Sequence, residues 1–358
     1  MPKDPRRFAD NRAIPTIGIA GSAAMGRRAL MRNGAGLLAA GAALGVLPGT
    51  MTGARAADPV SLVLNWVKSV QFGGHFAGLH NGFFAENDIE AEFISGGPGI
   101  DSINLVAAGE SMLGDRDSTN LILARAKGIP VKAFAAALQK SPYAMMSLAE
   151  SPVRSLEDMQ GKTIAIPSQR RPTMVALMRG AGLDPDSVTF VPTGTDPGIL
   201  PTGQVDAYFG WATNQGVMLQ MRGVDLEIVT LDELGDLTYP MVFFATEETL
   251  GEKADVVTRW LKAEIAAWTW FAENPEETAR VTVETYGQQG LDLEQQITES
   301  RTYPDYIMAG DALEKGALWI GPEKFEAGMK LAVDAGILEE AIDIEALVDQ
   351  SFITAAHA

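Results

Sequence analysis

The chain alternates short apolar runs with longer segments of helical spacing. Residues 89–94 alternate apolar and polar side chains, which predicts a strand with one buried face. Residues 61–65 predict an earlier strand, residues 76–84 predict a helix between the two, and a second helix is expected to end at Gly109. Seven further apolar or β-branched runs predict strands at residues 131–138, 143–148, 163–166, 189–191, 207–210, 227–229 and 241–245. This alternation predicts an α/β fold.

From residue 255 onward the pattern is that of helices. One helical face collects the apolar residues Val257, Trp260, Leu261, Ile265, Trp268 and Phe271. Trp260, Trp268 and Trp270 are three of the six tryptophans of the chain. Their spacing predicts a role in the core rather than in ligand binding.

The charge of the chain is unevenly distributed. Its 358 residues include 28 Lys and Arg against 46 Asp and Glu, a net charge of −18. Residues 1–56 hold eight of the basic residues and two of the acidic ones, so the remainder carries 20 basic and 44 acidic residues, a net charge of −24. A surface this negative repels nucleic acid and anionic membranes, and neither is expected as a partner.

Residues 1–56 have the pattern of a cleavable export signal. The pair Arg27-Arg28 precedes a weakly apolar run over residues 34–47, and a small-x-small cleavage site ends at Ala56. The run is too short to span a bilayer, and the arginine pair favours the twin-arginine route over the general one. A buried helix of the mature fold is the alternative. No Cys lies near the cleavage site, so we expect a soluble periplasmic protein without a direct membrane anchor.

Common catalytic signatures are missing from the sequence. It contains no G-x-S-x-G, G-x-x-x-x-G-K-[ST], H-E-x-x-H or G-x-G-x-x-G motif. It has no Cys, which excludes thiolate chemistry, and its three His are too few for a histidine-rich metal site. We therefore predict no catalytic residue, no metal site and no cofactor.

Aromatic and amide side chains follow the predicted strands, where an α/β sheet forms a ligand crevice. Asn65 and Trp66 end the first strand, and Gln71 and Phe72 lie in the loop after it. Aromatic rings can enclose a flat ligand, while amides match the donors and acceptors of a heterocycle. Trp66 as a lid over the core is an equal alternative.

The strand predicted over residues 207–210 ends with the same chemical pair, Trp211 and Asn214. Gln139 places an amide after another strand. Gln169 and Arg170 lie in the run 168–172 between a strand and a helix, where Arg170 could clamp an anionic or carbonyl group or be an ordinary surface residue.

Two further loops carry candidate groups. Gly97 lies in the run 95–99, which is expected to offer backbone N–H groups at a helix start or to be a plain turn. Asp115 could accept hydrogen bonds from ring N–H groups, and Asp117 could do the same or act as an N-cap.

These segments together resemble the periplasmic solute-binding proteins of the nitrate/sulfonate/thiamine-pyrimidine superfamily, the SsuA/THI5-like (NMT1) group. The segments that carry the resemblance are Leu64-Asn65-Trp66, Gln71-Phe72-Gly73-Gly74, Asn81-Gly82-Phe83-Phe84, Ile94-Ser95-Gly96-Gly97-Pro98-Gly99, Gln139-Lys140-Ser141-Pro142, the run 155–162 and Thr213-Asn214-Gln215. The resemblance implies a two-lobed binding protein of type II, with mostly parallel sheets flanked by helices and a ligand cleft between the lobes. By the same resemblance, lobe one spans residues 57–146 plus 241–358 and lobe two spans residues 147–240.

The resemblance also implies a function. It predicts a monomeric, non-enzymatic component of an ABC importer, which closes on a small planar nitrogen heterocycle, such as a thiamine-pyrimidine precursor or riboflavin, and delivers it to a permease and its ATPase. A receptor for an alkylsulfonate, taurine or nitrate is the alternative, and a pyrimidine-synthase-like enzyme is a third. The chain departs from the family pattern in that Phe72 stands where a His is common. The Cys-rich iron site of the synthases has no counterpart in a chain without Cys.

Overall fold

The computed structural model describes residues 56–168 and 170–358. The predicted export signal, except for Ala56, and the predicted site residue Gln169 lie outside the described residues. These described residues belong to one compact unit. None of the helices in its described part is long and apolar enough to cross a membrane.

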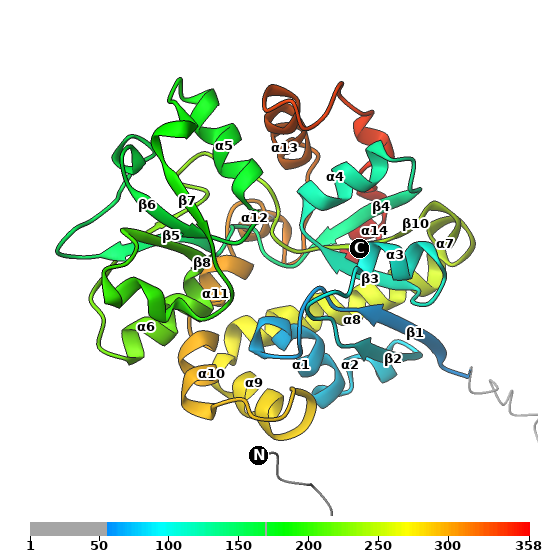
Figure 1. Cartoon of the computed structure of the whole chain (residues 1–358). Coiled ribbons are helices and arrows are strands. Elements are labelled where there is room, and N and C mark those ends of the chain that lie inside the picture. Colours follow the sequence, from blue (N-terminus) through cyan, green and yellow to red (C-terminus); the bar gives the residue numbers. More distant parts are fainter. Residues whose placement is uncertain (1–55, 169) are drawn as a thin grey trace, which may run out of the picture. The chain divides into compact units, whose positions relative to one another are not determined.

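The first of two five-stranded sheets has the strand order β2-β1-β3-β10-β4 (Figure 1). Its strands are β1 (Asp58–Val63), β2 (Ile89–Ile94), β3 (Leu113–Arg116), β4 (Val131–Ala136) and β10 (Val242–Thr246). β1 runs parallel to both β2 and β3, whereas β10 is antiparallel to its neighbours β3 and β4. The carboxyl ends of β1 and β3 therefore share one edge of this sheet.

The second sheet has the order β7-β6-β8-β5-β9. Its strands are β5 (Tyr143–Leu148), β6 (Thr163–Ile166), β7 (Thr189–Pro192), β8 (Ala207–Trp211) and β9 (Leu226–Thr230). β6 is parallel to β7 and β8, and β5 is antiparallel to β8 and β9. Both sheets are thus mixed, and each has four strands that run in one direction and one, β10 or β5, that runs the opposite way, which agrees with the predicted mostly parallel sheets. The strand with two antiparallel neighbours is β10 in the first sheet and β5 in the second. Each of these strands is the first one after the chain crosses from one sheet to the other.

The chain crosses between the sheets twice, over residues 137–142 and 231–241. All of β5 lies in the second sheet, so the predicted boundary at residue 146 falls inside a strand. The two crossings contact each other, because the Ser141 N–H donates to both carboxylate oxygens of Asp232 at 3.2 and 3.3 Å. We call the sheet containing β1, with its helices, the first lobe and the sheet containing β5 the second lobe.

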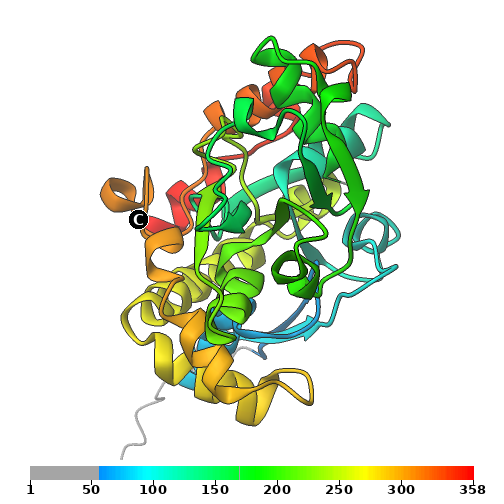
Figure 2. The same cartoon turned by 60° about the vertical axis from the view of Figure 1, so that its left-hand side comes forward.

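The helices surround both sheets (Figures 1 and 2). They are α1 (Gly73–Asn81), α2 (Phe83–Glu86), α3 (Ser102–Ala107), α4 (Ser118–Ala126), α5 (Arg171–Gly180), α6 (Val217–Met221), α7 (Glu247–Glu252), α8 (Ala254–Glu273), α9 (Pro275–Val281), α10 (Leu293–Ser300), α11 (Pro304–Ile307), α12 (Ala312–Lys315), α13 (Glu323–Asp334) and α14 (Ser351–His357). Helix α13 contacts α4 of the first lobe and α5 of the second, and α10 contacts α6. The C-terminal helices therefore bridge the lobes.

Helix α8 contributes the centre of the first-lobe core. Of the six residues predicted to share its apolar face, five are fully buried and Ile265 is partly buried. Trp260 and Trp268 are fully buried, as predicted, while Trp270 is partly buried. Helix α1 approaches α8 closely at Gly74, where an added Cβ would lie 2.3 Å from the Trp268 ring, so only glycine fits.

The strand β3 was not predicted from the sequence. Its four residues Leu113-Gly114-Asp115-Arg116 lack an apolar run, and the sequence predicted only candidate ligand groups over residues 115–118. Gly114 faces the ring of Phe244, where an added Cβ would lie only 2.6 Å away. Position 114 in the centre of the sheet thus requires a residue without a side chain. The polar residue Asp115 follows it toward the carboxyl end of β3.

Candidate functional site

The candidate site begins where β1 and β3 end together. The backbone N–H of Asn65, two residues after β1, donates to Oδ1 of Asp115 at 2.9 Å. The Asn65 side chain accepts a weak hydrogen bond from Gln71 Nε2 at 3.4 Å. Three residues predicted separately from the sequence are therefore joined in one hydrogen-bonded group.

Asp115 has unusual surroundings for a carboxyl group. Its side chain is fully buried, and among the described residues its Oδ2 has no hydrogen-bond partner. Burial raises the pKa of Asp115 to about 8, although the Asn65 N–H and the charge of Arg116 act in the opposite direction. At neutral pH this carboxyl is therefore mainly protonated, and its buried Oδ2 lacks the hydrogen bond that a buried polar atom normally has.

Two tryptophans predicted to stack on a ligand lie at the ends of strands in the two lobes. Trp66 is half-buried and packs against the first-lobe core, which agrees with the alternative that it covers the core. Trp211, at the end of β8, is also half-buried and meets the Tyr143 ring edge-on at a centroid distance of 5.5 Å. Phe72 differs from the expectation, because it is fully buried in the core and stacks on His75, and it presents no surface to a ligand.

Arg170 connects the lobes instead of standing open to an anion. Its Nη2 lies 3.6 Å from Oδ2 of Asp117, and its guanidinium lies 4.1 Å from the Tyr143 ring centroid. Burial disfavours the charge of Arg170, but Tyr143, Asp117 and Asp236 together raise its pKa above the ordinary value. The expected anion clamp is thus neutralised by partners within the protein.

Asp117 has the role of N-cap that the sequence offered as an alternative. Its Oδ1 accepts from the backbone N–H of Asn120 at 3.1 Å at the start of α4. The same carboxylate pairs with Arg170. A contact path therefore runs from Asp117, the residue after β3, through Arg170 and Tyr143 to Trp211 at the end of β8.

Asn214 is committed to the protein as well. Its Nδ2 donates to Oε1 of Glu299 in α10 at 2.6 Å, and Gln295 donates to the same oxygen at 2.6 Å. Burial raises the pKa of Glu299 to about 7, against the hydrogen bonds from Gln295, Asn214 and Gln296. Asn214 thus ties the second lobe to a C-terminal helix, which differs from its expected role as a ligand group.

The Gln139 side chain also forms hydrogen bonds within the protein. Its buried Nε2 donates to the carbonyl oxygens of Ala136 at 3.1 Å and Trp319 at 2.8 Å, and its backbone carbonyl oxygen accepts from Lys324 Nζ. The side-chain N–H groups therefore hold the first crossing segment against the C-terminal region.

The glycine run before α3 is a turn rather than a helix start. Helix α3 begins at Ser102, and its cap is Asp101, whose Oδ1 accepts from the Ile103 N–H at 3.0 Å. Gly97 has a φ of +149°, and the neighbouring Gly96 N–H donates to the Trp66 carbonyl at 3.0 Å. The turn therefore positions Trp66, and the expected N–H groups for a ligand at the helix start are absent there.

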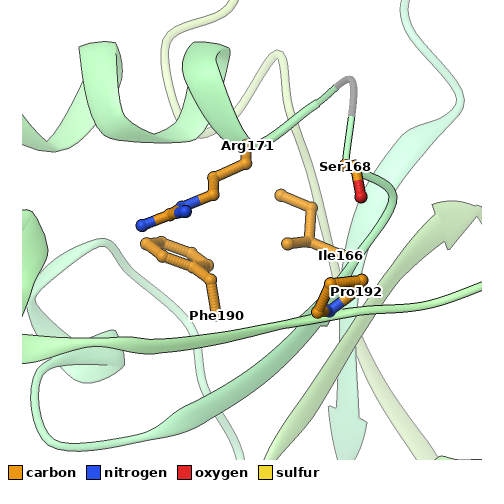
Figure 3. A pocket seen from close by; sticks show the side chains of 5 residues that line it. All are labelled: Ile166, Ser168, Arg171, Phe190 and Pro192. Carbon is orange, nitrogen blue, oxygen red and sulfur yellow. The ribbon is translucent and has the colours of Figure 1, made fainter.

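A separate small cavity of about 150 Å³ lies in the second lobe (Figure 3). It is lined by Ile166, Ser168, Arg171, Phe190 and Pro192. The Arg171 guanidinium lies 5.7 Å from the Phe190 ring centroid. Ser168 and Arg171 belong to the loop predicted as a clamp, but none of the predicted site residues lines this cavity.

Comparison with known proteins supplies the family. The family model described as NMT1/THI5 like matches residues 69–278. The chain belongs to the NMT1/THI5-like family. It has the periplasmic binding protein fold, since the aliphatic sulphonate binding protein SsuA of Escherichia coli superposes with a TM-score of 0.63 at 12% identity, covering 82% of this chain and 93% of that one.

Curated relatives of this NMT1/THI5-like protein differ in what their names say they do. The formylaminopyrimidine-binding protein of Halalkalibacterium halodurans is 25% identical over 250 residues, 68% of this chain and 76% of the relative. The riboflavin-binding protein RibY of Chloroflexus aurantiacus is 22% identical over 308 residues, 82% and 86% of the two chains. The 4-amino-5-hydroxymethyl-2-methylpyrimidine phosphate synthase of Legionella pneumophila is 25% identical over 250 residues, 68% and 79%.

The NMT1/THI5-like match includes Asp115, Arg170 and Trp211 but excludes Asn65 and Glu299. Sequence reasoning missed Tyr143 and Glu299 as members of the interlobe contacts. Tyr143 carried a usable signal, because it begins a strand directly after the crossing segment. Glu299 carried none, because its partner Asn214 is 85 residues away.

Proposed function

We propose that this protein is a non-enzymatic receptor for a small planar nitrogen heterocycle, held at the edge where β1 and β3 end. The observation that carries the proposal is the buried Asp115 carboxyl, whose Oδ2 lacks a partner among the described residues and whose Oδ1 is hydrogen-bonded to Asn65, the residue before Trp66 and the partner of Gln71. A hydrogen-bonding carboxyl beside an aromatic wall suits a flat ring with polar edge atoms. The names of the pyrimidine-binding and riboflavin-binding relatives support this ligand class.

Arg116, the residue after Asp115 in β3, is a second candidate ligand group. Its buried Nε has no hydrogen-bond partner in the described part of the chain. A carbonyl, hydroxyl or phosphate oxygen on the heterocycle would satisfy this donor.

A receptor for a sulfonate, taurine or nitrate is less well supported. Such a site was expected to depend on Arg170 and on the helix start after Gly97. Arg170 is paired with Asp117, and the N-terminus of α3 is capped by Asp101. Likeness in fold to a sulphonate-binding protein at 12% identity carries no ligand with it.

A synthase-like activity is also less well supported. The chain has no Cys, and the buried His75 is held by Glu264 at 2.8 Å among aromatic rings. We propose that the protein works in the periplasm as a monomer and presents its closed form to an ABC permease with its ATPase. The predicted signal and the sulphonate-binding neighbours, which are described as periplasmic, support this placement.

Isothermal titration of the full chain with an aminopyrimidine, riboflavin, taurine, an alkylsulfonate and nitrate tests the proposal. We expect a heterocycle to bind with a dissociation constant of about 1 μM or tighter, equivalent to about −8 kcal/mol, without being consumed. Binding of only a sulfonate or nitrate, or turnover of a pyrimidine substrate, would overturn it.

A further inference from the structure

Only one of the two oxygens of the Asp115 carboxyl has a hydrogen-bond partner among the described residues. Asp115 lies opposite Phe243 in the pairing of β3 with β10, and its Oδ1 accepts the Asn65 N–H at 2.9 Å. Because Oδ1 is already an acceptor, a proton on this carboxyl belongs on Oδ2. Oδ2 is the atom without a partner among the described residues.

Few charges face this carboxyl. Arg116, on the same strand, favours the ionised form, and Glu264 of α8 opposes it. His75 of α1 is bound to Glu264 at 2.8 and 2.9 Å, and α3 and β10 contain no ionisable side chain. Burial outweighs these charges and raises the pKa of Asp115 to about 8.

We infer that Asp115 acts as a neutral hydrogen-bond donor, so that the ligand presents an unprotonated ring nitrogen, of the kind found in an aminopyrimidine, to Oδ2. This inference rests on the proposed function. It reverses the direction of the hydrogen bond expected from the sequence, in which Asp115 accepts from a ring N–H group of the ligand. An ionised carboxylate at this position would select a ring N–H or a cationic ring instead.

Replacement of Asp115 by Asn tests whether its Oδ2 donates a hydrogen bond to the ligand or accepts one from it. In Asp115→Asn, Oδ1 can still accept from Asn65 while Nδ2 replaces the O–H as donor. We expect this variant to bind an aminopyrimidine within about threefold of the unaltered protein at pH 7, and Asp115→Leu, which has no donor, to lose more than about tenfold. A loss of more than about tenfold in Asp115→Asn would overturn the inference.

The pH dependence of binding gives a second test. Between pH 7 and 9.5 we expect the unaltered protein to lose about 30-fold in affinity for the aminopyrimidine as Asp115 ionises, and Asp115→Asn to remain constant. Affinity that rises with pH would overturn the inference.

A third measurement needs no ligand and therefore separates this inference from the proposed function. If Asp115 stays protonated in the folded protein, the unfolded chain releases a proton that the folded protein keeps. The free energy of unfolding then falls as pH rises from 5 to 8, whereas Asp115→Asn lacks this contribution. We therefore expect the melting temperature of Asp115→Asn, measured relative to that of the unaltered protein, to increase as pH rises over this range. Asp225→Asn, at an exposed position before β9, is the matched control and should follow the unaltered protein. Parallel curves for Asp115→Asn would contradict a neutral Asp115, whether or not a heterocycle binds.

Discussion

The Arg170 guanidinium of the second lobe lies 3.6 Å from the Asp117 carboxylate that caps α4 of the first. Both side chains are nearly buried, and the Tyr143 ring lies under the same guanidinium. A single side chain thus links the ends of strands from both sheets. The hinge-type closure expected of this fold would have to make or break this pair.

Removing this link should loosen the lobes. We expect Arg170→Ala to lower the free energy of unfolding by about 2 kcal/mol, because Asp117 loses its cation and Tyr143 its cation–π contact. Urea denaturation measures the stability, and X-ray scattering should show a larger radius of gyration. Arg171→Ala, at the next and exposed position, is the control. Equal effects of the two substitutions would contradict an interlobe role for Arg170.

Glu299 should make stability depend on pH. Its pKa is raised by burial from 4.5 to about 7, so between these values the folded protein keeps a proton that the unfolded chain releases. Its contribution to the free energy of unfolding therefore falls as pH rises from about 4.5 to about 7. We expect Glu299→Gln to show a shallower decline in melting temperature over this range. Glu294→Gln, on the exposed face of α10, should leave the decline unchanged, and an unchanged slope in Glu299→Gln would contradict the assignment.

Glu264 should be essential to the first-lobe core. Its carboxylate accepts from Trp268 Nε1 at 2.8 Å and binds His75 Nδ1, and all three side chains are fully buried. Glu264→Ala leaves these groups without their acceptor and should cost about 3–5 kcal/mol in a denaturant titration. Glu273→Ala, at the exposed end of the same helix, should cost less than about 0.5 kcal/mol. A small loss in Glu264→Ala would show that the network adds little.

The two half-buried tryptophans should carry much of the ligand affinity. We expect Trp66→Ala and Trp211→Ala each to weaken heterocycle binding by about 10-fold to 100-fold, through loss of ring contact. Titration calorimetry measures this, and Trp270→Ala on α8 is the control. Unchanged affinity in both site variants would remove the tryptophans from the site.

Local patterns were sufficient for several elements. The strands predicted at residues 89–94, 143–148 and 163–166 have those bounds in the structure, because alternation or β-branching between turn residues is a short-range property. The apolar face of α8 was predicted for the same reason. The strand β3 was missed because Gly114, Asp115 and Arg116 are placed in a strand by their neighbours and not by their own preferences.

The sequence by itself determined the α/β class, most strands and the resemblance to the NMT1/THI5-like family, since these depend on residues close together in the chain. It also selected Asn65, Gln71 and Asp115, which the structure joins by hydrogen bonds. Only the tertiary structure decided which candidate polar groups have hydrogen-bond partners within the protein. Asn214 and Gln139 satisfy their amides with partners 85 and 180 residues away, whereas Asp115 Oδ2 stays unpaired within the described chain. A buried polar group must find some partner, and only the fold places one within reach.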